Sequence, residues 1–143
     1  QLPSSAQKIV TSWGPYLTMQ STGNYLYPEY EAKACVTATC SYTATGTLDQ
    51  TYVLASSIPP NTQLILFLTV TMYNNGGYTT SVSAIFSNAT VTLTTTSTTA
   101  VTLTGSATVT TLTNGWLTLQ LSAIAGGTAY ISNAAAVLIP VAT

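Results

Sequence analysis

The chain has 143 residues, of which only five carry a formal charge: two are basic, three are acidic, and there is no histidine. The net charge of −1 and the absence of a basic patch exclude the usual nucleic-acid-binding classes, because these neutralise phosphates with many lysines and arginines. The missing histidines and scarce carboxylates also argue against acid–base chemistry. We therefore expect a protein that is not an enzyme and that uses no cofactor.

Threonine and serine supply most of the polar side chains, with 30 Thr and 14 Ser in the sequence. Threonine is β-branched and favours a pleated, half-exposed surface, whereas good helix formers such as Glu, Lys, Arg and Met are nearly absent. The composition predicts an all-β fold. The longest apolar runs, 64–68 and 134–140, are far shorter than the roughly 20 residues of a spanning helix, so we expect no membrane span.

The first twenty residues are irregular, and Pro3 and Gly14-Pro15 interrupt them. A short extended segment is predicted between these breaks, and its apolar members are Ile9, Val10 and Trp13. The start at Gln1 without a methionine is typical of an exported chain after signal removal.

Residues 24–43 alternate, so that Ala32 and Ala34 share one face and Glu31 and Lys33 share the other. Residues 47–56 form a second predicted strand. The segment 62–73 is the strongest strand prediction, and because it is apolar on both faces we expect a central strand that is covered on both sides.

The second half of the chain predicts further short strands separated by turns. Asn74–Gly77 and Asn114-Gly115 are typical of hairpins, because Asn-Gly adopts the positive φ of a type I′ turn. Gly105 predicts a bend or bulge, and Pro140 places the end of the last strand at an edge. The remaining predicted strands are 78–87, two or three within 90–113, 116–122, 128–132 and 134–142. Roughly eight to ten strands of this kind are typical of a sandwich or jelly roll.

Two short motifs suggest covalent modification. Cys35 and Cys40 are spaced so that a disulfide can close a small loop, as expected outside the cell; two reduced, buried cysteines are the alternative. Asn88-Ala89-Thr90 is an N-glycosylation sequon after a predicted strand, and a glycan there would add hydration to a surface with little charge. The Ser/Thr-rich run 90–113 suits O-glycans as well as strands.

Several chemical hypotheses remain open beside these. Glu29, Glu31 and Asp49 are the only carboxylates; they could serve glycoside hydrolysis or calcium binding, or form an exposed acidic stripe balanced by Lys33. Lys8 or Lys33 could form an isopeptide staple with an asparagine. The tyrosines could form a sugar platform or subunit interfaces; they are Tyr16, Tyr25, Tyr27, Tyr30, Tyr42, Tyr52, Tyr73, Tyr78 and Tyr130.

The β-rich pattern, very low charge, Ser/Thr richness and tail ahead of Gly14-Pro15 together resemble a family of archaeal extracellular filaments, the threads and bundling pili. These are similar in fold to the bacterial biofilm fibre proteins TasA and camelysin. The resemblance implies a secreted structural subunit that forms a homopolymer serving adhesion, aggregation or biofilm formation. It further implies a jelly-roll-like β-sandwich body at 14–143 and an N-terminal strand at 1–13 that is donated to the neighbouring subunit.

In this scheme Ile9, Val10 and Trp13 are the interface residues. The acceptor is Leu64–Tyr73 or the terminal strand Ala134–Ala142, because an incomplete sheet exposes backbone groups that a neighbour's strand can pair. A jelly-roll viral coat or surface-layer protein, or a secreted carbohydrate-binding module, is the alternative.

Overall fold

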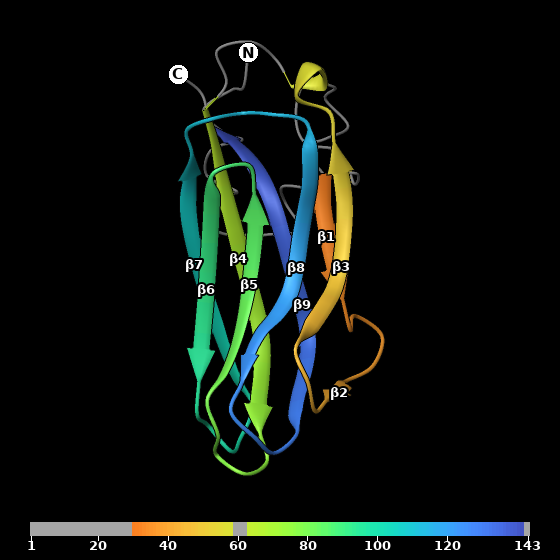
Figure 1. Cartoon of the computed structure of the whole chain (residues 1–143), viewed down its shortest axis with the longest axis vertical. Helices are drawn as coiled ribbons and strands as arrows, with labels where there is room; N and C mark the ends of the chain where they lie inside the picture. Colours follow the sequence, from red (N-terminus) through yellow and green to blue (C-terminus); the bar gives the residue numbers. More distant parts are fainter. Residues whose placement is uncertain (1–29, 59–62, 142–143) are drawn as a thin grey trace.

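The computed structural model describes residues 30–58 and 63–141, which form two antiparallel β-sheets packed face to face (Figure 1). The described residues form strands and one short 3-10 helix, without an α-helix, which confirms the predicted all-β sandwich. The elements are β1 (Glu31–Ala34), β2 (Cys40–Tyr42), β3 (Gly46–Val53), η4 (Ala55–Ser57), β4 (Gln63–Asn74), β5 (Thr80–Phe86), β6 (Ala89–Thr95), β7 (Val101–Val109), β8 (Gly115–Ile124) and β9 (Ala129–Val141).

The strands pair as one long hairpin that is rolled up on itself. Sheet A has the order β1-β9-β4-β7 with β2 also beside β9, and sheet B has the order β3-β8-β5-β6. Around the turn at Ser87 and Asn88, β5 pairs with β6, β4 with β7, β3 with β8 and β1 with β9. This nested order is that of a jelly roll.

The nested order contradicts the two predicted Asn-Gly hairpins. The turn at 74–77 leads from β4 in sheet A to β5 in sheet B, and the segment around Asn114 leads from β7 in sheet A to β8 in sheet B. Neither Asn75 nor Asn114 has a positive φ, whereas Ser87 in the β5–β6 turn has a φ of 53°. The first crossing is held by the buried side chain of Asn74, which donates to Thr80 Oγ1 and the Gly126 carbonyl.

Strand alternation builds the core as predicted. β4 lies between β9 and β7, so the prediction of a central strand is confirmed. Ile65 and Phe67 on its other face are half-buried. The largest fully buried side chains come from both sheets and include Leu64, Leu66, Leu68, Met72, Phe86, Leu117, Leu119, Leu121, Ile131 and Leu138.

Of two further details of the predicted strands, the bulge at Gly105 is wrong and the edge at Pro140 is confirmed. β7 runs through Gly105 without a shift in register; a Cβ there would lie 3.0 Å from Val91 Cγ1, so this glycine allows close approach between the sheets and makes no bulge. The end of β9 lies at an edge as predicted: among the described strands, β2 and β1 pair with β9 only as far as Val137 on the side away from β4. Pro140 lies past the part of β9 that β1 pairs, so its missing N–H removes no bond from that ladder.

The disulfide between Cys35 and Cys40 is present, with a Cα–Cα distance of 5.7 Å. It closes the loop between β1 and β2, the two strands that pair with the same edge of β9. The Cys35 carbonyl accepts a hydrogen bond of 3.2 Å from the Asn133 N–H. Asn133 has a φ of 52°, and the register of β9 shifts there, so the disulfide loop covers the irregular part of the ladder.

We expect the double substitution Cys35→Ser/Cys40→Ser to lower the free energy of unfolding by about 2 kcal/mol, because the disulfide closes a short loop and restricts the unfolded chain. Urea unfolding with and without a reductant measures the effect. The reductant should destabilise the wild type and leave the double variant unchanged; equal stability of both proteins without reductant would contradict the prediction.

Candidate functional site

The structure describes the body of the sandwich and not the predicted donor segment. Ile9, Val10 and Trp13 lie outside the described residues, as do Lys8 and Glu29. Within the described residues, the features that suit assembly gather on the outer face of sheet A, which we define as the side of β1, β9, β4 and β7 that points away from sheet B.

An apolar band crosses the outer face of sheet A. It consists of two cross-strand pairs between β4 and β9, Ile65 with Ile139 and Phe67 with Val137. An antiparallel sheet with one solvated face normally has polar residues at such positions. Instead, Val137 is 0% exposed and Ile139 is 3% exposed. This part of the outer face is therefore covered and not solvated.

The edge of β9 that faces away from β4 is only partly paired. β2 pairs with Ala129–Ile131 and β1 pairs with Ala134–Val137, and no described strand pairs with residues 138–141 on that side. Both edges of β4 are occupied, by β9 and β7. Of the two predicted acceptor segments, β4 can therefore contact a donated strand only through side chains of its outer face. β9 can contact it through its outer face and can also form backbone hydrogen bonds along part of its edge.

The outer edge of β1 is closed by side chains from the opposite sheet. Asp49 Oδ2 accepts a hydrogen bond of 2.8 Å from the Lys33 N–H, and Thr51 Oγ1 donates one of 2.6 Å to the Glu31 carbonyl. Asp49 Oδ1 accepts a further bond from the Gln50 N–H. Both oxygens of Asp49 thus hold backbone in place, and this edge is not open to another strand.

Glu31 and Lys33 lie on the outer face of sheet A, as their alternation predicted. Lys33 Nζ is 3.2 Å from Glu31 Oε2, and the Glu31 side chain is 3% exposed. The predicted exposed acidic stripe is therefore wrong for Glu31, which lies opposite Val137 in the covered part of the face. Burial raises the pKa of Glu31 above its ordinary value of 4.5, and the ion pair with Lys33 offsets part of this rise.

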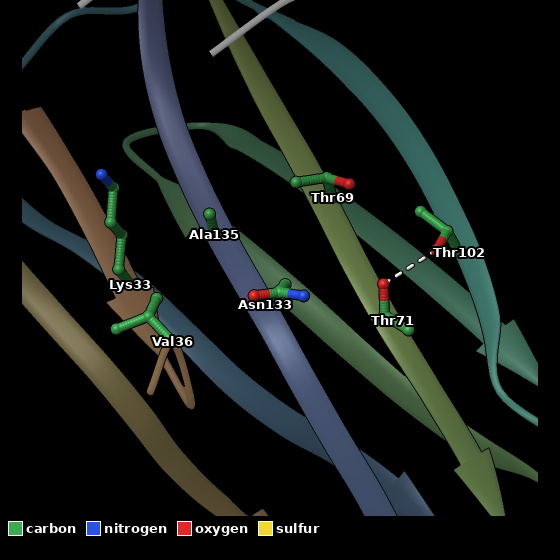
Figure 2. Close-up of a pocket in the computed structure, with 7 residues that line it drawn as sticks. All are labelled: Lys33, Val36, Thr69, Thr71, Thr102, Asn133 and Ala135. Carbon is green, nitrogen blue, oxygen red and sulfur yellow. Dashed lines mark hydrogen bonds between the residues drawn. The ribbon is translucent and has the colours of Figure 1, made fainter. Parts of the chain in front are cut away.

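A cavity of about 320 Å³ lies beside the apolar band on the same face (Figure 2). Asn133 and Ala135 on β9 lie at its centre, with Lys33 and Val36 on one side (Figure 2). On the other side Thr71 Oγ1 and Thr102 Oγ1 share a hydrogen bond of 2.8 Å (Figure 2). The lining is one amine, one amide, three hydroxyls and two apolar side chains, from Lys33, Val36, Thr69, Thr71, Thr102, Asn133 and Ala135. Such a lining can hydrogen-bond a polar, uncharged chain.

Three other predicted chemical sites are a metal site, an isopeptide staple and a tyrosine platform. Among the described residues, no group of three or more His, Cys, Asp and Glu could hold a metal ion. The amine of Lys33 forms an ion pair with Glu31, and the isopeptide staple stays a prediction. The described tyrosines do not gather into one platform: Tyr73 stacks on Tyr130 in sheet A with ring centroids 4.8 Å apart, whereas Tyr52 packs against Trp116 in sheet B.

Asn88 is exposed in the β5–β6 turn, where its side chain holds a neighbouring loop. Asn88 Oδ1 accepts hydrogen bonds from the Thr110 and Thr111 N–H groups at 3.2 and 3.1 Å, and Nδ2 donates to Thr110 Oγ1. The sequence offered a glycosylation motif here but no sign of this structural role. These hydrogen bonds depend on the nested strand pairing, which brings the β5–β6 turn beside the β7–β8 loop.

Comparison with known proteins adds no identification. No protein-family model matches the chain, and no curated protein matches it. Within the described residues, no helix is long and apolar enough to cross a lipid bilayer.

We expect Glu31→Gln to remove a pH-dependent loss of stability. A raised pKa in the folded state means that the contribution of Glu31 is fully present below its unfolded pKa and is lost as the pH rises through its folded pKa. Between about pH 4 and pH 7 the wild type should therefore lose stability relative to Glu31→Gln. Urea unfolding at several pH values tests this. If the wild type gains stability relative to the variant over this range, the ion pair with Lys33 outweighs burial and the prediction is wrong.

We expect Asn88→Ala and Thr90→Val to separate the structural role of Asn88 from glycosylation. Both substitutions remove the sequon, but Asn88→Ala also removes two backbone hydrogen bonds and should lower the free energy of unfolding by about 1 kcal/mol. Thr90 is exposed, and its replacement should change stability by less than about 0.5 kcal/mol. The measurement is denaturant unfolding of unglycosylated protein. Equal stability of the two variants would rule out the structural role.

Proposed function

We propose that this chain is the structural subunit of an extracellular filament that grows by donor-strand complementation. In the proposal, residues 1–13 of one subunit lie along the outer face of sheet A of the next. The apolar band is the observation that carries it, because its residues point out of the sandwich and Ile65 is only half-buried within a single chain. The donor residues Ile9, Val10 and Trp13 have the apolar character that this band requires.

The unpaired length of β9 supports a strand as the ligand of this face. Beside the apolar band, residues 138–141 lack a described partner on the side away from β4. A donated strand can pair with this backbone while its side chains contact the band, which combines hydrogen bonding with side-chain recognition. Because donor and acceptor are different surfaces, each subunit can bind one neighbour at each, and the contact propagates as an open filament.

The low charge of the chain and its disulfide are consistent with a filament outside the cell. With two basic and three acidic residues in the chain, neighbouring filaments would meet little like-charge repulsion, and near-neutral proteins tend to associate. The disulfide between Cys35 and Cys40 suits an oxidising exterior. Adhesion, cell aggregation and biofilm formation are the roles that such a bundle would serve.

The test uses two variants that each lose one half of the proposed contact. Deletion of residues 1–13 removes the donor and leaves the acceptor; Ile65→Asp places a charge in the acceptor band and leaves the donor. Burying an unpaired charge is strongly unfavourable, so we expect neither variant alone to form filaments in electron micrographs. A mixture should form heterodimers, seen by sedimentation, because the intact donor of one variant fits the intact acceptor of the other.

Thr47→Asp is the matched control, because it adds the same charge at an exposed position of sheet B and should leave filaments intact. Circular dichroism of each variant shows that the sandwich is folded. Filaments formed by the deletion variant would refute the donated strand, and filaments formed by Ile65→Asp would refute the apolar band as the acceptor.

A viral coat or surface-layer protein is the second candidate, and the jelly-roll strand order favours it, because capsid proteins use this architecture. Such a protein would assemble into closed shells or flat lattices. Electron micrographs of assembled wild-type protein distinguish these from filaments.

A further inference from the structure

An exposed aromatic pair lies on the outer face of sheet B, on the opposite side of the molecule from the apolar band. Tyr52 on β3 and Trp116 on β8 are direct cross-strand partners. Their rings meet edge to face, with centroids 5.1 Å apart and an angle of 77° between the planes. Tyr52 is 44% exposed and Trp116 is 52% exposed. We name this pair the aromatic corner.

Toward Gln50 the residues beside the aromatic corner are polar and uncharged, whereas Leu54 follows Tyr52 on its other side and is 50% exposed. The next outward cross-strand pair is Gln50 with Thr118, about 7 Å along the strands, and Gln120 follows on β8. Gln50 is exposed, and Thr118 and Gln120 are half-buried. A flat ligand resting on an aromatic ring would therefore have amide and hydroxyl groups within reach at its rim.

The near absence of charge on the described strands of sheet B limits the class of ligand that the aromatic corner can bind. Asp49 is the one charged residue in the described strands of this sheet, and its carboxylate is bound to backbone N–H groups. Nucleotide bases stack on aromatic rings, but their phosphates need basic partners that these strands lack. An acidic polysaccharide has the same need. A neutral sugar chain has both an apolar C–H face for stacking and hydroxyls for the neighbouring amides.

We propose that the aromatic corner binds a neutral glycan, with one hexose ring stacked on Trp116, Tyr52 bounding its edge, and Gln50 and Thr118 bonding its hydroxyls. A second copy of this chain fits less well, because a stable protein interface needs about 800 Å² per partner with an apolar centre. Beyond the corner, the outer face of sheet B carries mostly hydroxyls and amides, and its apolar member Ile85, opposite Thr118, is half-buried. The site is independent of the proposed filament contact, which uses the other sheet.

The test is calorimetric titration of the full-length chain with cellohexaose, a neutral β-linked hexose chain. We expect Trp116→Ala to weaken binding about tenfold or more, in line with the cost of removing one stacking ring, and Trp116→Phe to retain part of the affinity. Tyr78→Ala is the matched control, because Tyr78 is another half-exposed aromatic residue, 50% exposed, in the segment between β4 and β5. Tyr52→Leu provides a second variant of the site if Trp116→Ala does not fold, as judged by thermal melting.

Four outcomes would overturn the proposal. The first is no binding of cellohexaose, or of chitohexaose as a second neutral probe, by the wild type. The second is unchanged affinity in the folded Trp116→Ala or Tyr52→Leu variant. The third is a self-association of the wild type that Trp116→Ala abolishes, because the corner would then be a contact between copies. Preferential binding of oligo-dT or of a polyuronate hexamer would contradict the charge argument in the same way.

Discussion

β4 and β9 lie side by side in sheet A, and both carry apolar side chains on their two faces. Their inner side chains form the core with sheet B, as the full burial of Leu66 and Leu138 illustrates. Their outer side chains require cover of their own, because apolar area left in water loses about 25 cal/mol for each Å². A two-layer sandwich covers only one face of each sheet. Within one chain Val137 and Ile139 already have such cover, whereas Ile65 on β4 is only half-buried; the proposed assembly would extend the cover to β4.

Because charged residues are scarce, the polar side chains form hydrogen bonds mainly with other uncharged groups. On the outer face of sheet B, Ser83 Oγ lies 2.8 Å from both Thr92 Oγ1 and Ser122 Oγ, and Ser81 pairs with Thr94 in the same way. Each hydroxyl can donate and accept, so neighbouring strands bond to one another without ions. Among the described residues, Glu31 and Lys33 form an ion pair. Even in this pair, burial of the Glu31 side chain opposes ionisation of its carboxyl group.

The two outer faces of the sandwich have different chemistry. The outer face of sheet A combines an apolar band with an edge of β9 that the described strands pair only in part. The outer face of sheet B has paired hydroxyls, side-chain amides and one exposed aromatic corner. A subunit that is assembled through the first face can still present the second to its surroundings. Assembly and glycan recognition are thus compatible in one small domain.

Local sequence determined the strands and their faces. The alternation of Leu117, Leu119 and Leu121, and the two-sided run from Leu64, predicted buried positions correctly because strand side chains point to opposite faces in turn. The spacing of Cys35 and Cys40 likewise predicted their disulfide, since a short loop keeps two cysteines close whatever the rest of the fold does.

Tertiary structure decided which strands pair. Asn74–Gly77 and Asn114-Gly115 have the composition of hairpin turns, but each leads the chain from one sheet to the other. β4 pairs with β7 and β9, which are distant in the chain, and not with β5, which follows it. The same nested pairing brings Tyr52 opposite Trp116 and Asn88 beside Thr110. Contacts between residues so far apart in the chain depend on register across the whole sandwich, and no local pattern carries that information.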